Sequence, residues 1–202
     1  MQLMVMRSIL LLWFLSVTVT TVAQQEQLPV VDTAHVYRSM ESALQNPERV
    51  YKLNLSKKKL KHVPPEISRF TNLRELDLSK NKIKELPAQI GDMPNLERLN
   101  LSSNDITVLP EEIGKLQSLR YLGLNRNLIE YLPPSIGLLS NLEILELWDN
   151  EIQAIPDEIG QLKKLQELEL RGILFSDEEQ NRIKALVPQT QVYFSPSCNC
   201  LN

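Results

Sequence analysis

The fold of this chain is decided by residues 96–118, which read LERLNLSSNDITVLPEEIGKLQS. The next segment, residues 119–141, reads LRYLGLNRNLIEYLPPSIGLLSN and aligns with the first without a gap. The same register extends back to residue 73 and forward from residue 142, so the repeat is 23 residues long. A fixed period of roughly 20 to 50 residues is the sequence signature of a stacked repeat architecture.

Two residue types keep the same phase through these repeats. The asparagines are Asn81, Asn104, Asn127 and Asn150, and the prolines are Pro64, Pro87, Pro110, Pro133 and Pro156. Each Asn follows the last leucine of an L-x-x-L-x-L segment, where the chain has to turn while it is buried. A side-chain amide can both donate to and accept from backbone groups that would otherwise stay unpaired. We therefore expect the asparagines to form a structural ladder.

The alternating leucines of each repeat predict a short strand. Leu99 and Leu101 are two residues apart, which places both side chains on one face of a strand. Successive strands then pair in parallel. The following segment, Leu109-Pro110-x-x-Ile113-Gly114, returns the chain to the start of the next strand.

These L-x-x-L-x-L, Asn and L-P-x-x-I-G elements resemble the leucine-rich-repeat superfamily, in the class that includes Ras-suppressor-like, plant Ras-group and secreted bacterial repeat proteins. The resemblance covers about six repeats, over residues 50–175. It implies an α/β solenoid with a curved parallel sheet on its concave face and short helical or extended segments on its convex face. The activity that it implies is protein recognition, without a cofactor.

The start of the chain predicts export. Residues 1–23 contain Arg7, an apolar stretch over residues 9–19 and a small-residue cleavage site ending at Ala23, as a signal peptide does. An uncleaved membrane anchor is the alternative, but the apolar stretch is short for a membrane span. We therefore expect a secreted, periplasmic or cell-surface protein without a membrane span after cleavage.

The segments around the repeats are expected to cover the two open ends of the core. Residues 24–31 are predicted as a linker and residues 32–49 as an N-terminal cap helix, with Asp32 as its N-cap. Residues 176–202 are predicted to form a C-terminal cap helix that begins at Ser176, an edge strand over residues 191–194 and a Cys-x-Cys tail.

The first repeat departs from the pattern. Lys58 stands at the Asn position and Ser68 at the Gly position, which suits a terminal repeat with a solvated edge. Lys57, Lys59 and their neighbours could dock an acidic partner or headgroup, but a run of charges is more often a solvated face.

Cys198 and Cys200 leave several interpretations open. Export favours a disulfide, either local or between chains, although a bridge between residues two apart is strained. An inert tail is a second alternative. A metal site needs about four ligands, and with two His in the chain none is predicted.

Composition excludes other functions. The net charge of −3 and the lack of a basic, aromatic-interleaved patch argue against nucleic-acid binding. The sequence contains no G-x-S-x-G, phosphate-binding Gly loop or H-E-x-x-H motif, so we do not expect an enzyme.

The remaining candidate is the concave face of the sheet. Its predicted binding residues are an apolar group surrounded by charges: Tyr121, Ile144 and Trp148, with Arg126, Glu146, Asp149 and Arg171. Aromatic residues rimmed by charges are typical of binding hot spots, although single exposed apolar residues are common on any surface. We expect this face to bind a protein or peptide. The alternative is a structural or envelope protein that self-associates through its edges or its cysteines.

Overall fold

The computed structural model describes residues 32–196, which form one compact unit. These residues build an eight-stranded parallel sheet in which the strands follow one another in chain order. The strands are β1 (Val36–Tyr37), β2 (Lys52–Asn54), β3 (Glu75–Asp77), β4 (Arg98–Asn100), β5 (Tyr121–Gly123), β6 (Ile144–Glu146), β7 (Glu167–Leu170) and β8 (Gln191–Phe194). From β2 to β7 each residue pairs with the residue 23 positions later, so the sequence repeat is also the sheet register.

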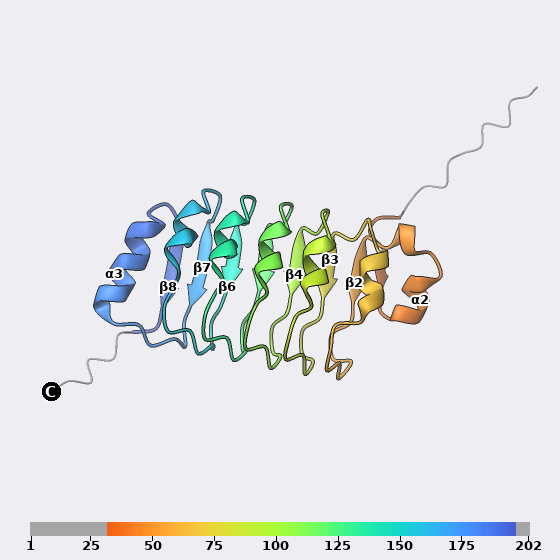
Figure 1. The fold of residues 1–202 in the computed structure, drawn as a ribbon, viewed down its shortest axis with the longest axis horizontal. Helices are drawn as coiled ribbons and strands as arrows, with labels where there is room; N and C mark the ends of the chain where they lie inside the picture. The colour runs from red at the N-terminus through yellow and green to blue at the C-terminus, as the bar shows by residue number, and fades with distance from the viewer. Residues whose placement is uncertain (1–31, 197–202) are drawn as a thin grey trace, which may run out of the picture. The chain divides into compact units, whose positions relative to one another are not determined.

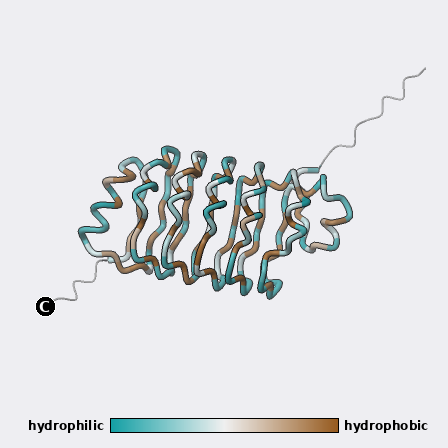
Figure 2. The backbone as a smooth tube through the Cα atoms, viewed as in Figure 1, coloured by the Kyte–Doolittle hydropathy of each residue, from teal (hydrophilic) through white to brown (hydrophobic). Residues whose placement is uncertain are grey.

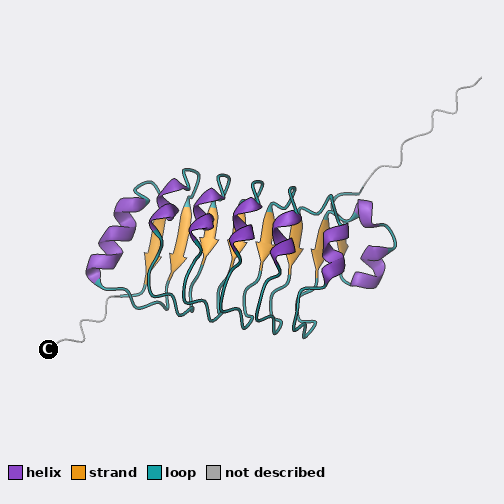
Figure 3. Ribbon diagram, in the orientation of Figure 1, coloured by secondary structure: helices purple, strands orange, loops and turns teal. Residues whose placement is uncertain are grey.

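The second layer of the solenoid consists of short helical segments (Figures 1 and 3). The α-helices are α2 (Met40–Leu44) and α3 (Asp177–Leu186), and the 3-10 segments are η1 (Pro47–Arg49), η2 (Pro65–Arg69), η3 (Ala88–Asp92), η4 (Glu111–Lys115), η5 (Pro134–Leu138) and η6 (Asp157–Gln161). The parallel sheet and this second layer are those of a leucine-rich-repeat solenoid. Within residues 32–196, none of these helices has the length and apolar character that crossing a membrane requires.

The leucine pattern places the core between the two layers. Leu99 and Leu101 are fully buried, as are Ile106 and Ile113 of the same repeat. In β3 and β6 the middle residue is buried and its two neighbours are half-buried. Bands of apolar residues therefore recur from repeat to repeat along the backbone (Figure 2).

The asparagines join neighbouring repeats through the backbone. The Asn104 amide nitrogen donates to the carbonyl oxygens of Leu78 (3.1 Å) and Leu101 (2.8 Å), and its oxygen accepts from Ile83 N (3.1 Å). The pattern recurs at Asn81, Asn127 and Asn150. Each side chain thus satisfies buried backbone groups in its own and in the preceding repeat.

A left-handed turn follows every repeat strand. The residue at this place has a φ between 54° and 78° in each repeat: Lys57, Lys80, Ser103, Arg126, Asp149 and Gly172. Non-glycine residues adopt this conformation uncommonly. The turn fixes the backbone of Arg126 directly after β5 and of Asp149 directly after β6.

Close packing of the 3-10 segments depends on glycine. A Cβ atom on Gly91, Gly114 or Gly137 would lie 2.5–2.6 Å from a backbone oxygen of the next repeat. The first repeat has Ser68 at this place. There an apolar pocket of about 260 Å³ opens between η2 and η3, lined by Ser68, Ile67, Met93 and neighbouring prolines.

The helix predicted over residues 32–49 is wrong in its start and extent. Asp32 accepts a hydrogen bond from Ala34 N (2.9 Å) in a turn, and Val36 and Tyr37 form β1 instead of helix. Helix α2 begins only after Ser39, whose hydroxyl accepts from Ser42 N (3.2 Å). The physical reason is that β1 pairs in parallel with β2 and so satisfies an edge that a helix would leave unpaired.

At the other end, α3 and β8 form at the predicted residues. Ser176 accepts a hydrogen bond from Glu179 N (3.2 Å), which is half of the predicted capping box. The Glu179 carboxylate does not return the bond; it accepts from Arg182 Nε (2.8 Å), and this contact lowers the pKa of Glu179. Ile183 and Val187 are buried.

Candidate functional site

The candidate site is the sheet face, which we define as the side chains that point away from the core between β1 and β8. In each strand from β2 to β7, its members are the first and third residues, the residue two places after the third and the left-handed turn residue that follows. Arg38, directly after β1, is also a member. In β6, for example, Ile144 and Glu146 are half-buried, whereas Leu145 between them is fully buried. Alternation along each strand therefore separates the sheet face from the core.

Tyr121 lies along the sheet face in space that glycine leaves free. A Cβ atom on Gly123 would lie 2.6 Å from the Tyr121 hydroxyl oxygen, so no larger residue fits in this arrangement. The Tyr121 hydroxyl donates to Glu146 Oε2 on the next strand (2.9 Å), and Asn125 Nδ2 donates to the same oxygen (2.6 Å). Burial, and then the hydrogen bond to Glu146, raise the pKa of Tyr121 well above its ordinary range.

An arginine covers each of the two aromatic rings. The Arg98 guanidinium carbon lies 4.2 Å from the centre of the Tyr121 ring, and that of Arg126 lies 4.5 Å from the Trp148 ring. Arg126 also approaches Asp149, with 3.6 Å between Nε and Oδ2. At these distances each guanidinium is attracted to the face of the ring that it covers.

The predicted binding residues are thus only partly brought together. Tyr121 and Glu146 share a hydrogen bond, Arg126 joins Trp148 and Asp149, and Ile144 pairs with Tyr121 in the sheet register. Arg171 belongs to a separate group: its Nε donates to Glu169 Oε1 (2.8 Å) and its guanidinium lies 5.7 Å from the Tyr193 ring. The Glu169 contact raises the pKa of Arg171.

The expectation that Tyr121, Ile144 and Trp148 are exposed is corrected by the structure. All three are half-buried. For the two rings the reason is local: an arginine lies over each of them, and Glu146 accepts a hydrogen bond from Tyr121. These contacts depend on side-chain directions that spacing alone does not give.

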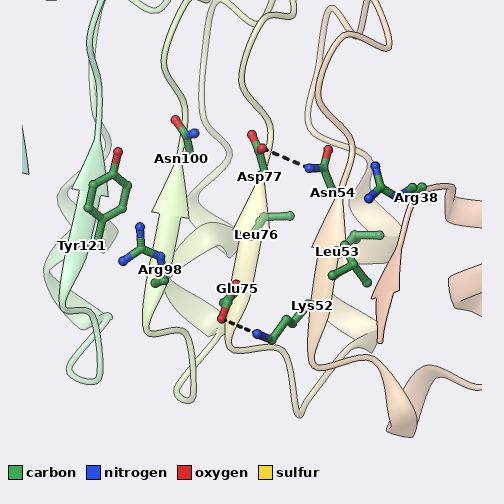
Figure 4. A pocket seen from close by; sticks show the side chains of 11 residues that line it. Arg38, Lys52, Leu53, Asn54, Glu75, Leu76, Asp77, Arg98, Asn100 and Tyr121 are labelled. Carbon is green, nitrogen blue, oxygen red and sulfur yellow. Dashed lines mark hydrogen bonds and ion pairs between the residues drawn. The ribbon is translucent and has the colours of Figure 1, made fainter. Parts of the chain in front are cut away.

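A pocket of about 290 Å³ occupies the other half of the sheet face (Figure 4). Arg38 and Tyr121 lie at its two ends, with Asn54, Asp77 and Asn100 in a row between them. Lys52 Nζ forms an ion pair with Glu75 (2.9 Å), and Asn54 Nδ2 donates to Asp77 Oδ2 (3.2 Å). The floor of this pocket is therefore polar and partly neutralised.

Sequence reasoning missed this pocket and two of its arginines. Arg98 occupies the same position in its repeat as Tyr121 does in the next one. Comparison of equivalent repeat positions therefore places Arg98 on the same face as Tyr121. The helix predicted over residues 32–49 hides Arg38, which in the structure directly follows β1 at the edge of the sheet.

The cysteine predictions concern residues that the structure does not describe. Cys198 and Cys200 lie outside residues 32–196, so their pairing stays a prediction. Within the described part of the chain, no group of three or more His, Cys, Asp or Glu residues is placed to hold a metal ion.

Comparison with known proteins identifies the family. A model of the leucine-rich repeat matches residues 48–106 and 71–129, and a model of a leucine-rich-repeat region matches residues 110–186. Together they cover more than half of the chain. No curated protein matches it.

Many solved structures are similar to this chain, among them the following two. A leucine-rich-repeat protein of Leptospira interrogans is 30% identical, with a TM-score of 0.56, over 79% of this chain and 54% of that one. An internalin (inlF) of Listeria monocytogenes is 20% identical, with a TM-score of 0.62, over 79% of this chain and 46% of that one. This chain therefore spans about half the length of each. The L-P-x-x-I-G class stays a prediction, but the repeats, the register and the family models agree that the chain belongs to the leucine-rich-repeat superfamily.

Proposed function

We propose that this protein is a recognition module that binds a protein or peptide through its sheet face, with Trp148 at the centre of the contact. The observation that carries this proposal is the pair of aromatic rings, Tyr121 and Trp148, each with an arginine over it. The half-buried Ile144 lies beside Tyr121 in the sheet register. Rings that are already ordered lose little conformational entropy when a ligand covers them. Leucine-rich repeats in general mediate protein recognition, which supports the same function.

The surroundings of the rings suit a polypeptide ligand. Glu146 and Asp149 are acceptors and Arg126 is a donor, and all three lie next to the rings in the structure. A central aromatic contact with a polar rim is the usual anatomy of a protein interface. Truncation of such a central Trp typically weakens binding by about 2 kcal/mol or more.

A peptide selection tests this proposal directly. A display library of random 16-residue peptides is selected on the full-length protein and, in parallel, on Trp148→Ala. The proposal predicts peptides that bind the wild-type protein and lose at least tenfold in affinity for Trp148→Ala. Leu138→Ala is the matched control, because Leu138 is an exposed apolar residue of η5 in the other layer. Peptides that bind the wild type, Trp148→Ala and Leu138→Ala with equal affinity would contradict the proposal.

We also propose that the protein is exported to the periplasm, the cell surface or the medium. Support comes from the sequence of residues 1–23, with Arg7 before the apolar stretch and Ala23 at the cleavage site. The proposed recognition surface would then face ligands outside the cytoplasm.

A further inference from the structure

We infer that the ligand of the sheet face is an extended polypeptide with an acidic segment and a basic segment on either side of an apolar centre. The acidic segment lies over β1–β4 and the basic segment over β6–β7. This inference rests on the proposed function and specifies the chemistry of its ligand. It follows from an unequal distribution of charge along the sheet face.

The half of the sheet face over β1–β4 is basic. Its cations are Arg38, Lys52, Lys57, Lys80 and Arg98, and its carboxylates are Glu75 and Asp77. Lys52 and Glu75 neutralise each other at 2.9 Å, and Asp77 accepts hydrogen bonds from Asn54 Nδ2 and Ser79 N. Within residues 32–196, Arg38, Lys57, Lys80 and Arg98 form no ion pair, and all four are exposed.

The half of the sheet face over β6–β7 is acidic. Its carboxylates are Glu146, Asp149, Glu167 and Glu169, and the cations nearby are Arg126 and Arg171. Both of these arginines are already engaged, Arg126 with Asp149 and Arg171 with Glu169. Glu167 is exposed and forms no ion pair among the described residues, and Glu146 accepts only from the neutral donors Tyr121 and Asn125.

The two halves meet at Tyr121, and Trp148 lies at the edge of the acidic half that is nearest to it. Tyr121 is on β5 between them, and Trp148 follows β6. Eight strands at about 4.8 Å spacing make the sheet face about 34 Å long, which corresponds to about ten residues of extended chain. A single polypeptide segment can therefore contact both charged halves and the rings at once.

Opposite charges on the two halves select the class of ligand. A polyanion such as a nucleic acid or an anionic membrane surface would be attracted by the cations over β1–β4 but repelled by the carboxylates over β6–β7. Charge complementarity across an interface sets specificity because misplaced like charges are costly. A polypeptide that carries its acidic and basic residues in separate segments is attracted by both halves.

The pocket between Arg38 and Tyr121 gives the acidic segment a defined place. Its volume of about 290 Å³ accommodates a carboxylate side chain. Its lining includes the amides of Asn54 and Asn100 and two carboxylates that are already engaged, Glu75 with Lys52 and Asp77 with Asn54. Arginine binds a carboxylate through two parallel hydrogen bonds. An acidic ligand residue in this pocket can therefore reach Arg38 or Arg98.

The test extends the same peptide selection to two charge variants. Arg38→Glu/Lys80→Glu reverses exposed cations of the basic half, and Glu167→Lys reverses an exposed carboxylate of the acidic half. Neither variant touches the two aromatic rings. The matched control, Arg69→Glu/Lys115→Glu, makes the same change of charge on the exposed surface of η2 and η4. Thermal unfolding of each variant confirms that it is folded.

The inference predicts that peptides whose binding depends on Trp148 carry acidic residues at one end and basic residues at the other. Their affinity should fall at least tenfold in Arg38→Glu/Lys80→Glu, fall severalfold in Glu167→Lys, stay within twofold in the control and decrease with added salt. Trp148-dependent peptides without separated charges, or with affinities unchanged in both variants, would overturn the inference and leave the proposed function standing. An absence of Trp148-dependent peptides would contradict the proposed function, and this inference with it.

Discussion

The hydroxyl of Tyr121 on β5 donates a hydrogen bond of 2.9 Å to the Glu146 carboxylate on β6. This bond forms because Gly123 leaves the space that the ring occupies, and because the sheet register places Glu146 beside Gly123. It connects two neighbouring repeats on the sheet face, at the border between the basic and the acidic half. A local feature of one repeat, a glycine, thus orders an aromatic ring of the proposed binding surface.

The same contact predicts a pH dependence of stability. The pKa of Tyr121 is raised in the folded protein, so the folded chain holds this proton more tightly than the unfolded chain. Its contribution is fully present below about pH 10, the ordinary tyrosine pKa, and is lost as pH rises further. We expect the free energy of unfolding to fall more steeply above pH 10 in the wild type than in Tyr121→Phe. Urea unfolding at a series of pH values measures this, and parallel curves for the two proteins would contradict it.

The asparagine ladder predicts a difference between two chemically similar substitutions. Asn104→Leu leaves the buried Ile83 N without its acceptor, at about 1–3 kcal/mol for an unpaired buried group. The carbonyl oxygens of Leu78 and Leu101 each lose one of two side-chain donors and keep the bonds from Asn81 and Asn127. Lys58 occupies the same repeat position but is exposed, so Lys58→Leu should change stability by about 0.5 kcal/mol or less. Thermal unfolding of both variants provides the comparison. Equal losses would show that the amide bonds do not stabilise the stack.

Repeat-to-repeat packing predicts a second contrast, between two glycines. A Cβ atom at position 114 would lie 2.6 Å from the backbone oxygen of Ser135, whereas one at position 160 would lie 3.2 Å from that of Leu186. Gly114→Ala should therefore cost about 1–3 kcal/mol through overpacking. Gly160→Ala should be nearly neutral, because alanine also reduces the entropy of the unfolded chain. Denaturant unfolding measures the two losses of stability. A larger loss for Gly160→Ala than for Gly114→Ala would show that close approach is not the reason for the glycines.

Export predicts a defined processed form. The protein isolated from outside the cytoplasm of its own host should begin at Gln24, because cleavage is expected after Ala23. Intact-mass spectrometry of the native protein identifies the first residue. A soluble cytoplasmic protein that retains Met1 would refute the export proposal.

The repeat pattern was sufficient to predict the parallel strands because each buried leucine has the same environment in every repeat. Leu99 and Leu122, for instance, pair directly in the sheet. The edge strand β1 was not predictable in this way. Val36, Tyr37 and Met40 have spacing that fits a helix as well as a strand, and only pairing with β2 decides between the two.

The repeat positions predicted which residues share the sheet face, but they did not predict which of these side chains contact one another. Alternation places Tyr121, Ile144 and Trp148 on the same face, and the structure places them there. The covering arginines and the Tyr121–Glu146 hydrogen bond depend on how long side chains bend across strands. Such directions follow from neighbours in the fold, so the degree of burial of the rings could not be read from spacing.

Tryptophan fluorescence tests the central claim, recognition through the sheet face, most directly. Trp148 is the single tryptophan of a chain that begins at Gln24, and Trp13→Phe gives the same condition in a chain that retains residues 1–23. Addition of a selected peptide should shift the Trp148 emission to shorter wavelength and reduce quenching by acrylamide, because the ligand excludes water from the half-buried ring. Calorimetry on the same samples establishes that the peptide is bound. Saturating binding with unchanged emission and unchanged quenching would contradict the account, because the ligand would then occupy another surface.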